Sequence, residues 1–291
     1  MSNFELQKQK KMKLTFKSIC LMLIALGLNS AVNAQITPQP SSTQTIVQDF
    51  GLGKITVNYS RPSMKGRKVF GALEPFDKVW RTGANSATVL TFTDAVNFGG
   101  TEIPAGEYGL FTIPNKTEWT VILSKAAKQW GAYTYNEKDD VLRIKVKPTM
   151  LKDKVETFTI QFASVLPTAA QLQLSWENTL VSVNLTTDID AKVMARIDAA
   201  MKGDKKPYFP AAIYYLENGK DLNQALTWVN EAEKAMPKAP YVKLWKGKIQ
   251  MKMGDKAGAQ ASALAGIDLA KAENNEEYIR LNTQLLESAK K

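Results

Sequence analysis

The chain has 291 residues, 44% of them hydrophobic and 23% charged, which is the composition of a soluble globular protein and leaves room for two ordinary domains. It contains no histidine and one cysteine, Cys20, so the sequence excludes metal sites built from Cys and His, and also Ser-His-Asp and Cys-His catalysis. The net charge of +10 falls to +6 without residues 1–34, which hold five lysines and one glutamate. That excess is mild and forms no basic run, so we expect no nucleic-acid partner.

The first 34 residues have the organisation of a secretory signal peptide. Lysines up to Lys17 precede an apolar run at 19–28, and the small-residue site Val32-Asn33-Ala34 precedes Gln35. The apolar run of about ten residues is too short to span a bilayer comfortably, although an uncleaved anchor is the alternative. Cys20 lies in that run without the small residues of a lipoprotein signal before it. We therefore expect an exported protein, periplasmic or at the cell surface, with no transmembrane anchor after cleavage.

Residues 45–187 carry short strand patterns, after a polar, proline-containing segment at 35–44 that we expect to be a disordered lead. Alternating or β-branched apolar residues mark strands at 45–60, 87–93, 106–114, 118–124, 141–148, 155–165 and 171–187. The cleanest run places Phe158, Ile160 and Phe162 on one face. A parallel sheet would need helical crossovers, and no helical pattern lies between these runs. The sequence therefore predicts an antiparallel β-sandwich or barrel of about nine strands over residues 45–187.

From Asp188 onward the pattern changes to alanine-rich segments separated by helix breakers. Asp188 is placed to cap a first helix, Gly203 ends it, and Pro207, Pro237 and Gly254 divide the rest. We expect helices at 189–202, 207–218, 221–236, 239–253, 255–272 and 274–289. The predicted fold class is α+β in two segregated domains, the second an all-α domain of helical hairpins at 188–291.

The helical part also shows a 34-residue internal period. Small residues recur at this spacing, from Ala225, Val229 and Ala232 to Ala259, Ala263 and Gly266. With Pro237 closing the first unit, this pattern resembles tetratricopeptide repeats, although Lys271 stands where the second proline belongs. An unrelated helical bundle is the alternative. The resemblance implies a surface for a protein partner rather than catalysis.

The connection at 59–85, YSRPSMKGRKVFGALEPFDKVWRTGAN, is long, glycine-punctuated and rich in cations. Connections of this kind on a rigid scaffold often present binding surfaces, although an ordinary solvated loop is the alternative. Aromatic rings beside arginines and amides suit a glycan, a small molecule or another planar or anionic ligand. We expect Trp119 and Trp176, which lie in strand patterns, to be core residues. The candidate ligand-binding residues are Arg61, Lys65, Arg67, Arg81, Asn85, Trp130 and Tyr133.

Other chemistry has little support in the sequence. Carboxylates that could form an acid/base pair are Glu74, Asp77, Glu107, Glu118, Asp139, Asp140 and Glu177, and their spacing selects no pair. No stretch has the spacing of a calcium loop or of a phosphate-binding glycine loop. We therefore name no catalytic residue, no metal ligand and no cofactor.

Seven segments of the β region carry a family resemblance: YSRPSMKGRKVFG, VWRTGAN, IPAGEYGLFTIP, EWTVILS, QWGAYTY, DVLRIKVKP and LSWENTLVSV. In these segments the β region resembles a secreted bacterial family known only as domain of unknown function 2911. The resemblance covers about residues 40–187, and the helical tail resembles the extension that some members carry. The family is typical of Bacteroidetes-type bacteria, which implies a periplasmic or cell-surface setting, and it brings no established activity.

These observations favour a secreted, non-enzymatic protein in which a β-sandwich binds a ligand or envelope component and a helical module docks a protein partner. A carbohydrate-active hydrolase using two carboxylates is the main alternative. A third hypothesis is a structural envelope protein that interacts only through its helices.

Overall fold

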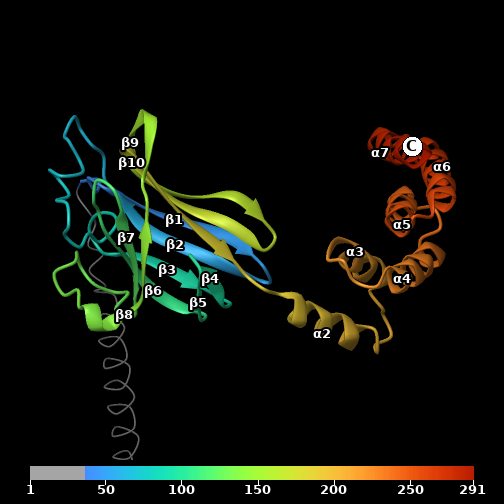
Figure 1. Cartoon of the computed structure of the whole chain (residues 1–291), viewed down its shortest axis with the longest axis horizontal. Helices are drawn as coiled ribbons and strands as arrows, with labels where there is room; N and C mark the ends of the chain where they lie inside the picture. The colour runs from blue at the N-terminus through green and yellow to red at the C-terminus, as the bar shows by residue number, and fades with distance from the viewer. Residues whose placement is uncertain (1–36) are drawn as a thin grey trace, which may run out of the picture. The chain divides into compact units, whose positions relative to one another are not determined.

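The computed structural model describes residues 37–291, which divide into a β unit that ends at Thr186 and a helical unit that begins at Thr187 (Figure 1). The predicted signal peptide, 1–34, lies outside the described residues. Among the helices of the described residues, none is long and apolar enough to cross a membrane.

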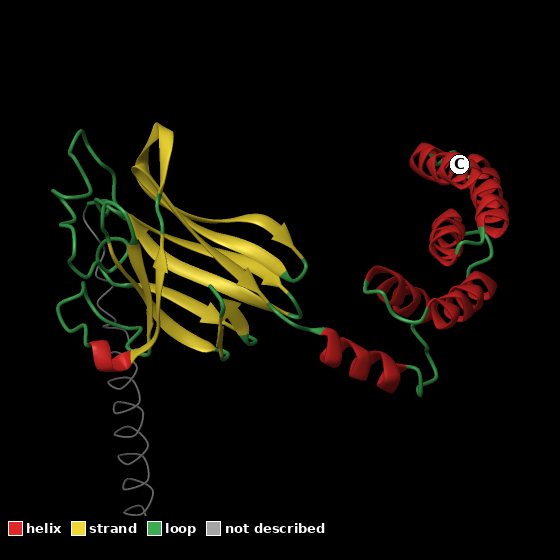
Figure 2. Ribbon diagram, in the orientation of Figure 1, coloured by secondary structure: helices red, strands yellow, loops and turns green. Residues whose placement is uncertain are grey.

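The β unit consists of two antiparallel sheets (Figure 2). The six-stranded sheet has the order β1-β2-β3-β6-β7-β8, with β1 (Ser42–Phe50), β2 (Gly53–Arg61), β3 (Thr88–Phe92), β6 (Gly106–Ile113), β7 (Trp119–Ser124) and β8 (Asp140–Val146). The four-stranded sheet has the order β5-β4-β10-β9, with β5 (Thr101–Ile103), β4 (Val96–Phe98), β10 (Ala169–Thr186) and β9 (Thr149–Leu166). Every strand pair in both sheets is antiparallel, as predicted.

The sequence patterns miss parts of this architecture. The three-residue strands β4 and β5 form a hairpin that was not predicted, and β9 begins at Thr149 rather than at 155. Strand β1 begins at Ser42, inside the segment predicted as a disordered lead, and Ser42 pairs with Arg61 of β2.

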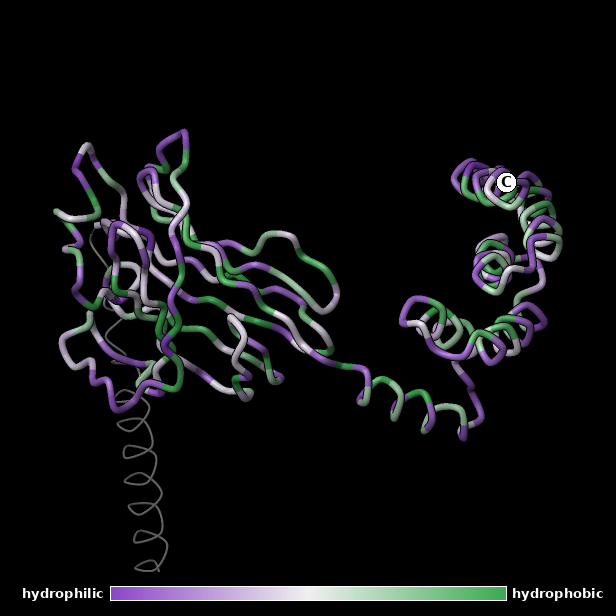
Figure 3. The backbone as a smooth tube through the Cα atoms, in the orientation of Figure 1, coloured by the Kyte–Doolittle hydropathy of each residue, from purple (hydrophilic) through white to green (hydrophobic). Residues whose placement is uncertain are grey.

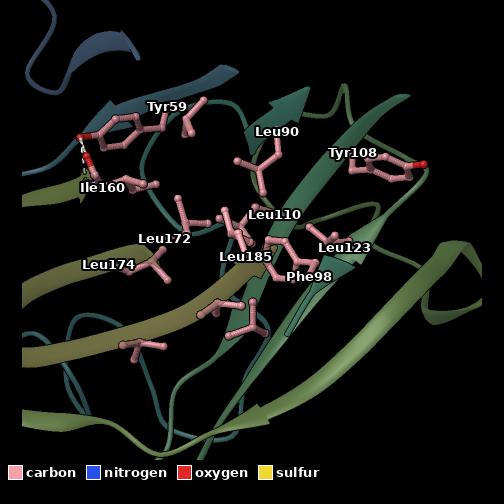
Figure 4. Close-up of a cluster of buried hydrophobic side chains, with 14 of the residues drawn as sticks. Tyr59, Leu90, Phe98, Tyr108, Leu110, Leu123, Ile160, Leu172, Leu174 and Leu185 are labelled. Atoms are coloured by element: carbon pink, nitrogen blue, oxygen red, sulfur yellow. Dashed lines mark hydrogen bonds between the residues drawn. The ribbon is translucent and has the colours of Figure 1, made fainter. Parts of the chain in front are cut away.

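The core lies between the two sheets and follows from the alternation of side chains along the strands, which Figure 3 shows as alternating hydropathy. Figure 4 shows part of it, where Leu90 and Leu110 of the larger sheet meet Leu172 and Leu185 of β10. Each of these side chains is at most 1% exposed. Burial of one such side chain stabilises the fold by about 1.5–3 kcal/mol. The predicted face of β9 is confirmed, because Phe158 and Ile160 are buried and Phe162 packs against them.

At one end of the sandwich the core is aromatic. Trp119 and Trp176 are 2% and 1% exposed, which confirms them as core residues, and Trp80 is 3% exposed. The rings of Trp80 and Trp176 stack with centroids 5.8 Å apart, and Phe70 packs edge-on against Trp119 at 4.8 Å. Because Phe70 and Trp80 come from the connection between β2 and β3, this cluster fixes that connection to the sandwich.

The helical unit contains the six expected helices, α2 (Asp190–Ala200), α3 (Tyr208–Glu217), α4 (Leu222–Ala235), α5 (Pro240–Met253), α6 (Lys256–Ala272) and α7 (Glu276–Lys290). The side chain of Asp188 accepts a hydrogen bond from the backbone N–H of Asp190 at 2.9 Å, where α2 begins. The N-cap residue of α2 is Ile189, which makes no side-chain capping bond, so Asp188 lies one residue before the predicted position. Asp221 and Asp255 are the N-cap residues of α4 and α6, and their side chains accept hydrogen bonds from backbone N–H groups of the first turn.

Small residues let these helices approach closely. The recurring residues at 225, 229, 232, 259, 263 and 266 are all buried. A Cβ on Gly247 of α5 would lie 2.6 Å from Leu285 Cδ2 of α7, and one on Gly266 would lie 2.3 Å from Asn282 Oδ1. Helix α5 contacts α3 and α7 as well as its neighbours along the chain, so the helical pairs stack on one another.

Candidate functional site

The connection between β2 and β3, residues 62–87, begins with a segment that forms backbone hydrogen bonds to β9 of the other sheet. Phe158 N donates to Pro62 O at 2.8 Å, and Met64 N donates to Glu156 O at 2.8 Å. Of the seven non-glycine residues with positive φ among the described residues, four lie in this connection, namely Lys65, Asp77, Thr82 and Asn85. Strained backbone of this kind persists only where surrounding contacts fix it, and it gathers at functional sites.

Two of the predicted arginines hold this connection together. Arg61 Nε donates to Phe158 O at 3.2 Å and its Nη2 donates to Thr159 Oγ1 at 2.8 Å, both on β9. Arg67 donates through Nε to Met64 O and through Nη2 to Ser63 O, both at 2.8 Å. Arg61 lines neither of the two cavities described below, so we leave it out of the proposed site, whereas Arg67 lines one of them.

A cavity of about 280 Å³ lies beneath this connection, and we call it the cationic cavity. Its charged lining residues are Lys65, Arg67, Arg81 and Glu74. Its other walls come from Pro40, Ser41, Pro62, Ser63, Leu73, Gly83, Ala84 and Trp176. Three cations and one carboxyl group therefore face a space of small-ligand size.

Arg81 is the least satisfied member of this set. It lies between Trp80 and Thr82, which are 3% and 0% exposed, so its backbone is fixed from both sides. Its Nε is buried and, among the described residues, has no hydrogen-bond partner. Buried donors are nearly always paired in folded proteins, so this unpaired Nε is an exception.

The carboxyl group of Glu74 lies in the wall of the same cavity. Burial raises its pKa to about 7, and the charge of Arg81 opposes that rise. Its backbone is held by Gly71 N, which donates to Glu74 O at 2.9 Å, and by Val69 O, which accepts from Glu74 N at 3.0 Å. The sequence offered Glu74 as one of seven carboxylates, and only the fold shows that it lies beside Arg81.

A second cavity, of about 340 Å³, has an uncharged polar lining, and we call it the amide cavity. It is lined by Gln39, Thr43, Asn58, Tyr59, Ser60, Asn85, Ser86, Ala87 and Trp130. Asn85 Nδ2 lies 3.2 Å from Ser60 Oγ and 3.3 Å from Ser41 O. Since Ala84 lines the cationic cavity and Asn85 the amide cavity, the two spaces adjoin.

The two predicted loop aromatics differ in position. Trp130 is 66% exposed and lines the amide cavity, and its backbone forms an isolated β-bridge with Ser86. Tyr133 is 83% exposed and lines neither cavity, although its ring lies over Gly131. The structure therefore brings Lys65, Arg67 and Arg81 together, and sets Asn85 with Trp130 beside them.

One contribution was missed altogether. Gln39, Pro40 and Ser41, which precede β1 in the predicted lead, form walls of both cavities. No local pattern could have shown this, because their contacts are with Asn85, more than forty residues further along the chain.

Comparison with protein-family models gives a match over residues 41–185 to a family described as a protein of unknown function, DUF2911. No curated protein and no solved structure matches the chain. The match begins just before β1 and ends in β10, so it covers both sheets and the connections that form the two cavities. Through its β unit, the chain belongs to the DUF2911 family.

Proposed function

We propose that this protein is an exported, non-enzymatic binding protein whose cationic cavity takes a small anionic ligand. The observation that carries the proposal is Arg81, which lines the cavity with Lys65 and Arg67 and whose buried Nε has no hydrogen-bond partner among the described residues. An unsatisfied buried donor destabilises a fold by about 1–3 kcal/mol. A carboxylate or phosphate oxygen at that position would remove this penalty and form a charge-assisted hydrogen bond, which is about twice as strong as a neutral one.

The protonation state of Glu74 sets the net charge of the cavity and therefore makes its affinity for an anion depend on pH. Below its pKa of about 7 the carboxyl group is mostly neutral, so the cavity presents three cations to a ligand. Above that pH an ionised Glu74 repels an anion. Ligand affinity is therefore highest in mildly acidic solution.

Export and a partner complete the proposal. The charged, apolar and small-residue order at 1–34 supports cleavage and a periplasmic or cell-surface location. The 34-residue period and the stacked helix pairs of 188–291 support a tetratricopeptide-like module that docks a protein partner.

Titration calorimetry with inorganic phosphate tests the anion site. Lys65→Gln and Arg81→Gln each remove one cation, and we expect each to weaken binding by about tenfold or more, which is ~1.4 kcal/mol. The matched control is Lys205→Gln, at an exposed lysine of the helical unit, which lowers the net charge by the same amount without touching the cavity. Equal affinity in the cavity variants and the control would contradict the proposal.

The alternative of a glycan hydrolase has one observation in its favour. A carboxyl group with a pKa of about 7 is suited to donate a proton in catalysis. A two-carboxylate mechanism needs a second group, however, and among the described residues Glu74 is the single carboxylate that lines the cationic cavity. Turnover of a glycan panel that is lost in Glu74→Gln would favour this alternative over simple binding.

A further inference from the structure

The amide cavity is chemically different from the cationic cavity beside it. Its lining carries side-chain amides from Gln39, Asn58 and Asn85 and hydroxyl groups from Thr43, Ser60 and Ser86, and no charged side chain lines it. Each of these groups can both donate and accept hydrogen bonds, as a hydroxyl group does, so the lining suits a ligand that carries many hydroxyl groups.

Trp130 adds an apolar surface at this polar cavity. An indole that is 66% exposed has little of the protein's own chain covering it. Indole rings have a large apolar face and a polar N–H, and they are preferred where a ligand has an apolar face next to polar groups.

The backbone that carries Trp130 is fixed in place. Ala87 N donates to Gln129 O at 2.9 Å, and Gly131 N donates to Asn85 O at 3.0 Å, on either side of the bridge between Ser86 and Trp130. An exposed ring on a fixed backbone loses little conformational entropy when it stacks on a ligand.

The base of the same loop is closed by a polar cluster. Tyr135 OH donates to Asp140 Oδ2 at 2.6 Å, and Arg143 Nη1 donates to both Tyr135 OH and Asp140 Oδ2 at 2.8 Å. The ring of Tyr135 also packs on Phe111, which is fully buried. The loop from Gln129 to Tyr135 is therefore held at both ends.

We propose that the amide cavity and Trp130 form a saccharide subsite, so that the ligand of this protein is an acidic oligosaccharide. This inference rests on the proposed function, because the acidic group occupies the cationic cavity while a neighbouring sugar ring lies in the amide cavity. The apolar face of that ring stacks on Trp130, and its hydroxyl groups bond to Asn58, Asn85 and Ser86.

The geometry supports a ligand that reaches both spaces. The segments 39–43 and 83–87 each contribute to both cavities, and Asn85 Nδ2 donates to Ser41 O at 3.3 Å on the ridge between them. The proposed ligand places one sugar unit in each space, whereas a single phosphate group fills only the cationic cavity.

The experiment compares Trp130→Ala with Tyr133→Ala in the full chain. The second variant is the matched control, because Tyr133 is also an exposed aromatic of the same loop but lines neither cavity. The probes are trimers of galacturonate, glucuronate and mannuronate, the corresponding neutral trimers, and inorganic phosphate, all measured by calorimetry.

We expect at least one uronate trimer to bind more tightly than both its neutral trimer and phosphate. Trp130→Ala should weaken that binding by about tenfold or more, as loss of a stacked aromatic anchor does, and should leave phosphate binding unchanged. Tyr133→Ala should change neither. If phosphate binds but no uronate trimer is sensitive to Trp130→Ala, the saccharide subsite is wrong and the anion site stands. If no anionic probe binds to the wild-type protein, both proposals fail.

Discussion

Replacing Glu74 by glutamine tests whether burial in the wall of the cationic cavity raises the pKa of this carboxyl group. The shift of the Glu74 pKa from its ordinary 4.5 to about 7 corresponds to roughly 2.5 units, and each unit is worth ~1.4 kcal/mol. That gives an upper limit of ~3.5 kcal/mol, and because Glu74 is only partly buried we expect about 1–2 kcal/mol after screening by solvent.

The sign of the effect follows from where each state ionises. As pH rises from about 4.5 to about 7, Glu74 loses its proton in the unfolded chain but keeps it in the folded protein. The unfolded state therefore binds fewer protons, so the wild-type protein loses stability through this window and stays level above it. Glu74→Gln has no proton to lose there. We expect the variant to match the wild type near pH 4 and to exceed its free energy of unfolding by about 1–2 kcal/mol near pH 8.

Urea unfolding followed by tryptophan fluorescence measures this difference, because four of the six tryptophans, at 80, 119, 130 and 176, lie in the β unit. Glu102→Gln, at an exposed position on β5, is the control and should show no such pH dependence. A difference between Glu74→Gln and the wild type that is the same near pH 4 and near pH 8 would refute the reasoning, because Glu74 would then titrate as a solvated carboxyl group.

Three further substitutions test other parts of the structure, each by thermal unfolding. Tyr135→Phe removes the hydroxyl group that donates to Asp140, a nearly buried carboxylate, and should destabilise the β unit by about 1–3 kcal/mol. An unchanged thermal midpoint would show that the polar cluster of Tyr135, Asp140 and Arg143 does not hold the loop. Gly247→Ala places a methyl group against Leu285 Cδ2, and the overlap costs about 1–3 kcal/mol while the better helix propensity of alanine offsets about 1 kcal/mol. We therefore expect a net destabilisation of the helical unit by up to about 2 kcal/mol, and a stabilised variant would mean that the Leu285 side chain can turn away. Arg61→Ala should lower the free energy of unfolding by about 1–2 kcal/mol and leave the phosphate affinity of the folded protein unchanged. A loss of phosphate affinity without a loss of stability would show that Arg61 belongs to the binding site.

The sequence predicts most of the architecture because its strands and helices are strongly patterned. All six helices appear where breakers such as Pro237 and Gly254 divide the chain. The hairpin of β4 and β5 was missed because strands of three residues are too short to show a period. The first part of β9, from Thr149, is largely exposed, so it lacks the apolar alternation that marks the rest of that strand.

The site is only partly predictable, because residue type does not show whether a cation is already bonded. Arg61 and Arg81 look alike in the sequence, in a connection with several other cations. In the fold, Arg61 bonds to Phe158 and Thr159, which lie 97 and 98 residues further along the chain, whereas the Nε of Arg81 has no such partner among the described residues. Long-range contacts of that kind leave no local pattern.

The central claim is that the buried face of Arg81 receives an anion. A crystal of residues 35–291 soaked in selenate, whose anomalous signal locates the oxyanion, tests this most directly. We predict a selenate oxygen within hydrogen-bond distance of Arg81 Nε, with Lys65 and Arg67 turned toward the same ion. An empty cationic cavity at saturating selenate, with Arg81 Nε bonded to a protein carbonyl group instead, would contradict the claim.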